Sequence, residues 1–454
     1  MAEQFEDQGG AATMNPSALA RWVQSRVMSA MVREGAEERR HSDAEKARVK
    51  QGKAHCIEYF HQVDDPYSVM AAQCLPALMA RYPVEWKIHL VSGADGRNNP
   101  EPDMLLPLAR YDAALVAPYY ALHFPSTPVV PTTDQVELAR RALCDLPVEQ
   151  FAAAAERVGL ALFTPGSDLA GVLDTLKLAS VDEARAALQA GDAHQSALKH
   201  YSGGMFYYGG DWYWGVDRLY LLESRLQSLG VGAQGEGVLY PRPAIDPGTY
   251  KANGSLTLEA YVSLRSPYTA ISFDEAVALC DRAGVRLEVK PVLPMVMRGV
   301  SLTRTKGMYI FRDTAREARA RGGRFGPVYD PIGNPVRQAY SLFPWAREQG
   351  RSVAYISAFL NAAFMEGINT NNDRGLRKVV EAAGLDWSEA QQHLGSKEGE
   401  EELEANRLQM LETGSWGVPS FRLLDSEGEE VCWAWGQDRL WVMAREIQRL
   451  LVQA

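Results

Sequence analysis

The pattern of apolar and polar positions divides the chain into two long segments with the same plan. In each, an apolar β-branched run predicts a strand, at 54–60 and at 256–262. Pro-Tyr-Ser or Pro-Tyr-Thr then opens a helix, because proline at the first helical position loses no hydrogen bond. A second strand is predicted at 84–91 and at 286–292, followed by about 110 residues of mainly helical pattern.

Each segment closes with a strand, a turn, a second strand and a helix. The closing strands are predicted at 206–208 and 212–214, and at 420–424 and 430–435. The order βαβ, helical insertion, ββα indicates an α/β fold in which a mixed sheet is flanked by helices. The sequence therefore predicts two such domains in one chain.

The two segments also match residue by residue at both ends, which indicates a tandem duplication. The matched pairs are Glu58 with Glu259, Pro66 with Pro267, Tyr67 with Tyr268, Trp214 with Trp435, Asp217 with Asp438 and Arg218 with Arg439. We expect a helical extension at 1–50, a first domain at 51–237, a linker rich in proline and glycine at 238–254, and a second domain at 255–454. The helical pattern at 16–50 is interpreted as a solvated lead-in, with an oligomerisation arm as the alternative.

Composition and charge narrow the class of partner. Hydrophobic residues are 46% and charged residues 23%, as in ordinary globular chains. A net charge of −10 argues against nucleic acid. No apolar run reaches the roughly 18 residues of a membrane span, and the start of the chain has no basic stretch followed by an apolar one. We expect a cytoplasmic protein without a membrane partner, and a homo-oligomer remains open.

Cysteine and histidine give no recognisable site. The five cysteines include no C-x-x-C pair, so they are expected to be reduced core residues. The eight histidines include no H-x-x-x-H pair, so no metal is expected, and His55 and His61 are interpreted as packing residues. No glycine-rich phosphate-binding motif occurs.

The second segment resembles the DsbA-like branch of the thioredoxin-like superfamily. The resemblance rests, in order, on SPYT, KGMYIFRDTAREARARG, FMEGINTNNDRGLRKVVEAAGLD, GSWGVPSF and WGQDRL, and the first segment shares it only at its two ends. It is closest to 2-hydroxychromene-2-carboxylate isomerases and kappa-class glutathione transferases. It implies two tandem thioredoxin-like domains, each with a helical insertion.

The resemblance also implies a glutathione site in the second domain. Ser266 would donate a hydrogen bond to the glutathione sulfur, where the helix N-terminus stabilises a thiolate; the alternative is a plain N-cap. Val418 and Pro419 would form a cis-proline loop that pairs with the cysteinyl backbone. Gln437 and Asp438 would hold the γ-glutamyl end, with Arg439 close by; the alternative is that Asp438 lies near a helix N-terminus in an internal ion pair. Tyr268 completes this set.

Several positions depart from the family pattern. The stretch 297–307 lacks the usual asparagine, for which Thr303, Thr305 or Lys306 is a candidate substitute. In the first domain Asp65 stands at the place of Ser266 and Gly204 at that of Pro419. The first domain is therefore interpreted as a degenerate partner, and the alternative is that Asp64 or Asp65 acts as an acid or base or binds a different ligand.

The leading hypothesis is a glutathione-dependent isomerase or transferase that acts on a small electrophilic organic substrate, with glutathione as cosubstrate. A non-catalytic binding or assembly protein is the second hypothesis. A thiol–disulfide oxidoreductase is the third, and the absence of C-x-x-C disfavours it. The two domains are expected to pack against each other.

Overall fold

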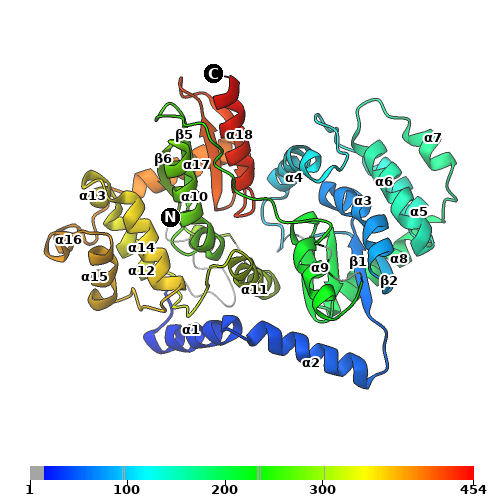
Figure 1. Ribbon diagram of the computed structural model, residues 1–454, viewed down its shortest axis with the longest axis horizontal. Coiled ribbons are helices and arrows are strands. Elements are labelled where there is room, and N and C mark those ends of the chain that lie inside the picture. Colours follow the sequence, from blue (N-terminus) through cyan, green and yellow to red (C-terminus); the bar gives the residue numbers. More distant parts are fainter. Residues whose placement is uncertain are drawn as a thin grey trace. The chain divides into compact units, whose positions relative to one another are not determined.

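The computed structural model describes residues 15–94, 96, 98–232, 235, 237–300 and 302–453 and has an α/β fold with two four-stranded sheets (Figure 1). Two compact units form, one from Glu38 to Pro243 and the other from Ala244 onward together with the residues up to Glu37. We call them the first and second domain. Their boundary lies inside the segment 238–254 that the sequence predicts as a linker.

The first domain contains α2 (Ala36–Lys50), β1 (Cys56–His61), α3 (Pro66–Arg81), β2 (Glu85–Leu90), α4 (Pro102–Val116), η2 (Ala117–Tyr120), α5 (Thr133–Leu143), α6 (Val148–Phe163), α7 (Leu169–Asp174), α8 (Val181–Ala197), β3 (Met205–Tyr208), β4 (Asp211–Trp214), η3 (Val216–Arg218) and α9 (Leu219–Ser228). Helix α2 begins two residues before the boundary between the units.

The second domain contains α1 (Ala18–Val32), β5 (Thr257–Val262), α10 (Pro267–Ala283), β6 (Arg286–Pro291), η4 (Met295–Arg298), α11 (Arg304–Ala320), α12 (Asn334–Ser341), α13 (Phe343–Glu348), α14 (Ser352–Phe364), α15 (Asp373–Ala382), α16 (Trp387–His393), α17 (Glu400–Glu412), β7 (Ser420–Leu424), β8 (Glu430–Trp435) and α18 (Leu440–Gln453). The insertion between β6 and β7 is helical, as predicted.

The two sheets have the same strand order. The first is β2-β1-β3-β4 and the second is β6-β5-β7-β8. In each, the first two strands along the chain are parallel and the last two are added antiparallel. This confirms the predicted mixed sheets and the thioredoxin-like plan of both domains. The first strand differs slightly from its predicted range: β1 begins at Cys56, whereas the sequence predicts residue 54.

The central strand of each sheet lies in the core, and a helix starts close to its end. Every residue of β5 is buried, and α10 contacts β5 and β6. Helix α18 contacts β7 and β8, and α17 contacts β6. In the first domain α8 contacts β2, while α3 packs on α6 (Figure 1). The polar residues that cap α3 and α10 are therefore placed at the edge of a rigid core.

The predicted helix at 16–50 is two helices, α1 and α2, rather than one. The break falls between Val32 and Ala36, where Gly35 has a φ of 73°. The chain leaves α1 at Arg33, with φ −56° and ψ 145°, and Gly35 then adopts a left-handed conformation that costs glycine no steric penalty before α2 begins. The two halves also belong to different compact units, since α1 contacts α11 of the second domain.

Within the part of the chain that the structure describes, no helix is both long and apolar enough to cross a bilayer. The cytoplasmic location stays a prediction, and the first residues of the chain, on which it rests in part, lie outside the described range.

Candidate functional site

Ser266 lies between β5 and α10 and caps the N-terminus of that helix. Its backbone is extended, with φ −91° and ψ 116°, and its hydroxyl oxygen accepts a hydrogen bond from the N–H of Thr269 at 3.1 Å. Pro267 occupies the first helical position, as the sequence predicts. The hydroxyl therefore stands at the positive end of the α10 dipole, beside the N–H groups of the first turn.

The predicted cis-proline loop is present and meets Ser266. The Val418–Pro419 peptide bond is cis. The Ser266 hydroxyl donates to the carbonyl oxygen of Val418 at 3.3 Å, across 152 residues of sequence. The N–H of Gly436 donates to the Pro419 carbonyl at 3.0 Å, whereas among the described residues the Val418 N–H has no acceptor. Two elements of the proposed site thus converge, and one backbone donor beside them is available.

Three buried polar atoms near this junction have no hydrogen-bond partner among the described residues. They are Thr269 Oγ1 in the first turn of α10, Trp416 Nε1 two residues before Val418, and Gln437 Oε1 next to Gly436. Buried polar atoms in folded proteins are nearly always paired, with protein groups or with ordered water. Three segments that flank Ser266 and the cis-proline loop thus each hold a buried polar atom without a partner among the described residues.

Lys306 brings positive charge to the same loop. Its ammonium lies 5.2 Å from the centroid of the Trp416 ring, an arrangement favourable for a cation–π interaction. Burial lowers the pKa of Lys306 to about 8. The sequence offers Lys306 only as one of three candidate substitutes, because nothing in the spacing shows that α11 brings it to Trp416.

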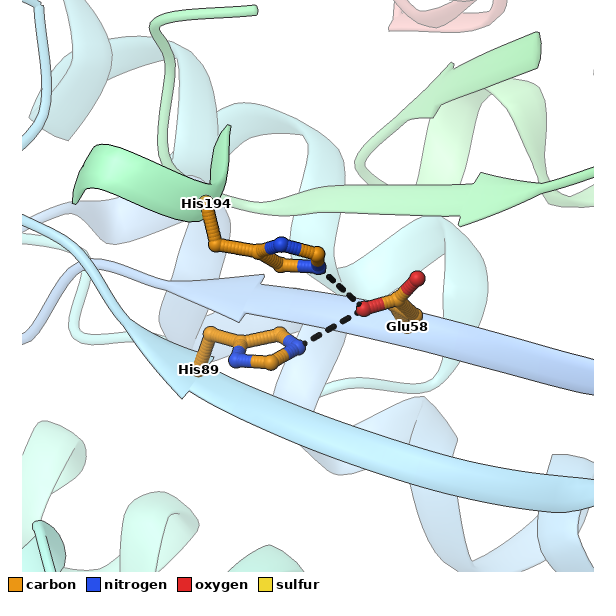
Figure 2. Close-up of side chains that lie close together, drawn as sticks. All are labelled: Glu58, His89 and His194. Carbon is orange, nitrogen blue, oxygen red and sulfur yellow. Dashed lines mark hydrogen bonds and ion pairs between the residues drawn. The ribbon is translucent and has the colours of Figure 1, made fainter. Parts of the chain in front are cut away.

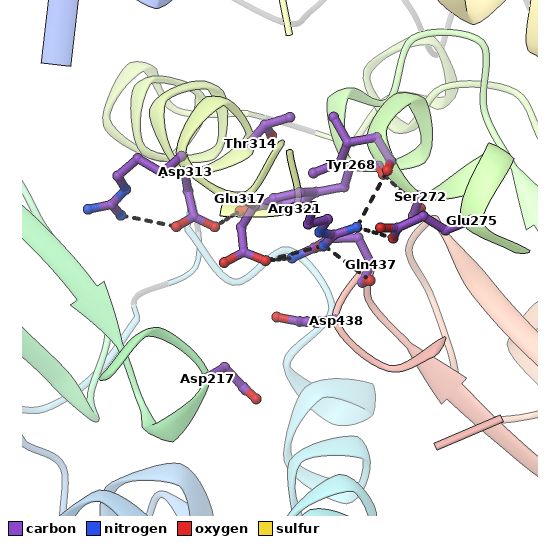
Figure 3. Close-up of polar contacts among 12 residues, drawn as sticks. Asp217, Tyr268, Ser272, Glu275, Asp313, Thr314, Glu317, Arg321, Gln437 and Asp438 are labelled. Carbon is purple, nitrogen blue, oxygen red and sulfur yellow. Dashed lines mark hydrogen bonds and ion pairs between the residues drawn. The ribbon is translucent and has the colours of Figure 1, made fainter. Parts of the chain in front are cut away.

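Gln437 is tied into a buried network rather than exposed (Figure 3). Its Nε2 donates to Glu317 Oε2 on α11 at 3.0 Å, and the same oxygen lies 3.2 Å from Arg321 NH2. Arg321 also pairs with Glu275 on α10. Gln437 therefore helps to join the turn before α18 to α11, and its side-chain oxygen, Oε1, is buried without a partner among the described residues.

Tyr268 also makes a contact within the domain. Its hydroxyl donates to Asp313 Oδ2 at 2.8 Å. The same pair recurs in the first domain, where the hydroxyl of Tyr67 donates to Asp112 Oδ2 at 3.0 Å. Since the pair is kept in the domain that lacks Ser266 and the cis-proline loop, we infer a structural role for it in both domains.

Asp438 and Arg439 are neighbours in an ion pair. Arg439 is 2% exposed, and its NH1 lies 3.6 Å from Asp438 Oδ1. It also donates to the backbone carbonyl of Asp438 at 3.2 Å. The structure thus has the internal ion pair that the sequence analysis left open as the alternative to a ligand clamp.

At the equivalent place in the first domain, Asp65 caps α3. Its carboxylate accepts hydrogen bonds from Tyr67 N at 3.3 Å, from Ser68 N at 2.8 Å and from Ser68 Oγ at 2.7 Å. Burial raises the pKa of Asp65 to about 6. Gly204 lies directly against it, since a Cβ atom at Gly204 would be 3.3 Å from Asp65 Oδ2. The backbone of Gly204 also lies close to the first turn of α3, since the same Cβ atom would be 3.3 Å from Ser68 N.

The cysteines are free thiols, as the sequence analysis expects, and none of them lies at either helix start. Burial raises the pKa of Cys56 to about 11 and that of Cys280 and Cys432 to about 12. Thiols with raised pKa values carry little thiolate at neutral pH and are poor nucleophiles. Nothing in these surroundings favours dithiol exchange.

The fold and this junction together define a thioredoxin-like domain with a serine, and no cysteine, at the start of the helix that follows its first strand. The second domain is a DSBA-like thioredoxin domain, since residues 257–448 match that family.

Solved structures with a similar fold include 2-hydroxychromene-2-carboxylate isomerase, which is 21% identical, with a TM-score of 0.37 over 43% of this chain and 97% of that one. A probable DsbA oxidoreductase from Streptomyces coelicolor is 20% identical, with a TM-score of 0.35 over 44% and 91%. The cytosolic disulfide reductase DsbM from Pseudomonas aeruginosa is 19% identical, with a TM-score of 0.34 over 43% and 99%. A search of curated proteins found no match.

Proposed function

We propose that the second domain binds glutathione, or a thiol like it, as the thiolate at Ser266, and uses it to isomerise or conjugate a small electrophilic organic compound. The observation that carries the proposal is the junction between a hydroxyl at the N-terminus of α10 and the cis-proline loop, 3.3 Å apart. A glutathione thiolate bound there supplies the nucleophile.

The residues of the junction suit a thiolate. To serve it, the Ser266 hydroxyl turns its proton from the Val418 carbonyl toward the sulfur, while its oxygen still caps α10. The helix N-terminus and the Lys306 ammonium both favour a nearby anion and lower its pKa. The Val418 N–H is available to pair with the cysteinyl carbonyl of an extended peptide.

The second candidate is a non-catalytic binding or assembly module. It is favoured by the contacts of Gln437 and Arg439, which already bond to Glu317 and Asp438. In that case the junction binds no free thiol, and the domain serves as a scaffold.

Calorimetric titration with glutathione tests the proposal. We expect one site per chain in the wild type. Ser266→Ala should weaken binding by about 1.5–3 kcal/mol, the value of a hydrogen bond to a charged group, or about 10- to 150-fold in Kd. Asn372→Ala is the matched control, because it removes another N-cap of the same domain, at α15. It should lower stability without changing Kd.

S-methylglutathione separates thiolate stabilisation from general binding. A thioether carries no charge, so Ser266→Ala should change its Kd much less than that of glutathione. An equal loss of affinity for both ligands would show that Ser266 contributes to binding without stabilising a thiolate. Absence of any binding heat with glutathione would favour the assembly module.

A further inference from the structure

The first domain has a cluster of three metal-ligating side chains that the proposed site does not use. Glu58 on β1 and His89 on β2 point to the same face of the sheet, since in the register Glu58 lies beside Lys87 and Phe60 beside His89. His194 reaches this face from α8, which contacts β2. His89 lies 31 residues after Glu58 in the sequence, and His194 lies 136 residues after it.

Both imidazoles converge on one carboxylate oxygen (Figure 2). Glu58 Oε2 lies 2.9 Å from His89 Nε2 and 2.6 Å from His194 Nε2. The possible ligand atoms all lie within 4.8 Å of one another. The side chains of Glu58, His89 and His194 are 17%, 24% and 40% exposed, so the cluster is partly sheltered and still open to solvent.

Packing holds the two rings in place. The buried Phe60 ring stacks on the His89 ring at 4.8 Å and 26°, and on the His194 ring at 5.9 Å and 22°. Gly191, three residues before His194, allows α8 to press on β2, since a Cβ there would be 1.9 Å from the Leu90 carbonyl oxygen. The donors are therefore fixed by sheet and helix, which is what a metal site requires.

The second domain provides an internal comparison. At the place of Glu58 it has Glu259, which lies 3.4 Å from Lys290 Nζ and 3.4 Å from Arg422 NH1. Lys290 stands in the register position of His89. A charged ammonium or guanidinium offers no lone pair, whereas a neutral imidazole binds metals readily. The second domain neutralises its buried carboxylate with fixed charges, and the first domain surrounds the equivalent carboxylate with potential ligands.

We propose that Glu58, His89 and His194 bind one divalent transition-metal ion, and that Zn²⁺ fits the donor set. Two imidazole nitrogens and one carboxylate oxygen are a common three-ligand set for zinc, which leaves a position for water. Metal–ligand bonds of about 2.0–2.2 Å need the N···O distances to open only slightly. A proton carried on Nε2 of either imidazole would move to Nδ1 or to solvent when the ion binds, because the metal takes the Nε2 lone pair.

A cavity of about 310 Å³ borders the cluster, and the fourth coordination position of the ion would open toward it. His89 and His194 line it together with Cys144, Phe151 and Gly191. A water or a small ligand on the metal would occupy this space. The proposal concerns the first domain and does not depend on thiol binding in the second.

Titration of the chelator-treated full chain with Zn²⁺ alone tests the proposal. We expect one equivalent bound per chain, and loss of affinity by about tenfold or more in Glu58→Gln and in His194→Ala. The matched control is His123→Ala, which removes an exposed histidine of the same domain and should bind as the wild type does. Equal Zn²⁺ affinity in all four proteins, or no equivalent bound by the wild type, would overturn the site.

Thermal unfolding keeps the test valid if a variant is unstable. A ligand that binds only the folded state raises its Tm. Zn²⁺ should therefore raise the Tm of the wild type and of His123→Ala, but not that of His194→Ala, whatever their Tm values without metal. A Zn²⁺-induced shift of the same size in His194→Ala would mean that the ion binds elsewhere.

Discussion

At the scale of single residues, the same backbone position has different chemistry in the two domains. Ser266 and Asp65 both cap the helix that follows the first strand of their sheet, and both accept hydrogen bonds from its first turn. The serine hydroxyl is neutral and can turn toward a ligand. The Asp65 carboxylate is half-buried beside Gly204, and its partial burial raises its pKa to about 6.

The Asp65 carboxyl should make the stability of the first domain depend on pH. Its folded pKa of about 6 is above the ordinary value of 3.8, so its stabilising contribution is complete below about pH 4 and is lost as the pH rises through 6. Relative to Asp65→Asn, the wild type should lose up to about 3 kcal/mol of unfolding free energy between pH 4 and pH 7. Urea denaturation of both proteins across this range measures the difference.

Asp386→Asn is the control, because Asp386 caps α16 at the surface and hydrogen bonds from Ser388 lower its pKa. The contribution of Asp386 to stability should therefore be present at neutral pH and lost in acid, which is the opposite pH dependence to that of Asp65. If the difference in unfolding free energy between wild type and Asp65→Asn does not vary with pH, the pKa of Asp65 is not raised in the folded state.

At the scale of elements, the close approach of α8 to β2 decides where His194 lies. Gly191→Ala would place a Cβ against the backbone of Leu90, which cannot move aside as a flexible side chain can. We expect it to destabilise the first domain by about 1–3 kcal/mol, as overpacking does. Denaturant unfolding of the purified variant measures the loss.

Gly307→Ala is the matched control, since Gly307 lies in α11 and its added Cβ would meet only Leu302 at 3.6 Å. It should stabilise the second domain by about 0.5–1 kcal/mol, because alanine has the higher helix propensity. If Gly191→Ala and Gly307→Ala changed the unfolding free energy in the same direction, the contact between Gly191 and Leu90 would not explain the effect of Gly191→Ala.

At the scale of the whole molecule, the N-terminal helix α1 belongs to the compact unit that carries the candidate site. Arg21 is 1% exposed, and its NH1 donates to the carbonyls of Asp330 at 2.8 Å and Ile332 at 2.6 Å. Ser25 and Ser29 on the same face bond to the backbone at 328–330. The segment acts as a structural part of the second domain rather than as a solvated lead-in.

Arg21→Ala should therefore destabilise the second domain, although it lies more than 200 residues away in sequence. Removing the guanidinium leaves buried carbonyls without a partner, which costs about 1–3 kcal/mol. Arg26→Ala on the exposed face of α1 makes the same change in helix propensity and should stay within about 0.5 kcal/mol of the wild type. Unfolding followed by tryptophan fluorescence compares the two, and equal losses would contradict the role of Arg21.

Much of each domain could be predicted from sequence because it depends on local patterns. Strand periodicity, the Pro-Tyr helix starts and the residue order of the closing hairpins predict both mixed sheets. The cis bond before Pro419 and the cap at Ser266 were also predicted, since loop and cap chemistry involves only a few neighbouring residues. The break at Gly35 was missed, although a glycine within a helical pattern is a known signal for it. The packing of the two domains on each other and any homo-oligomer stay predictions.

The sequence by itself determined the order of elements, the two-domain plan and the residues that begin α3 and α10, because these follow from periodicity and capping. Only the tertiary structure decided which distant side chains meet. Gln437 joins Glu317 across 120 residues, and Glu58 receives His89 and His194 from a neighbouring strand and a helix of the insertion. Such meetings depend on how helices pack on a sheet, and no local pattern encodes the resulting distances.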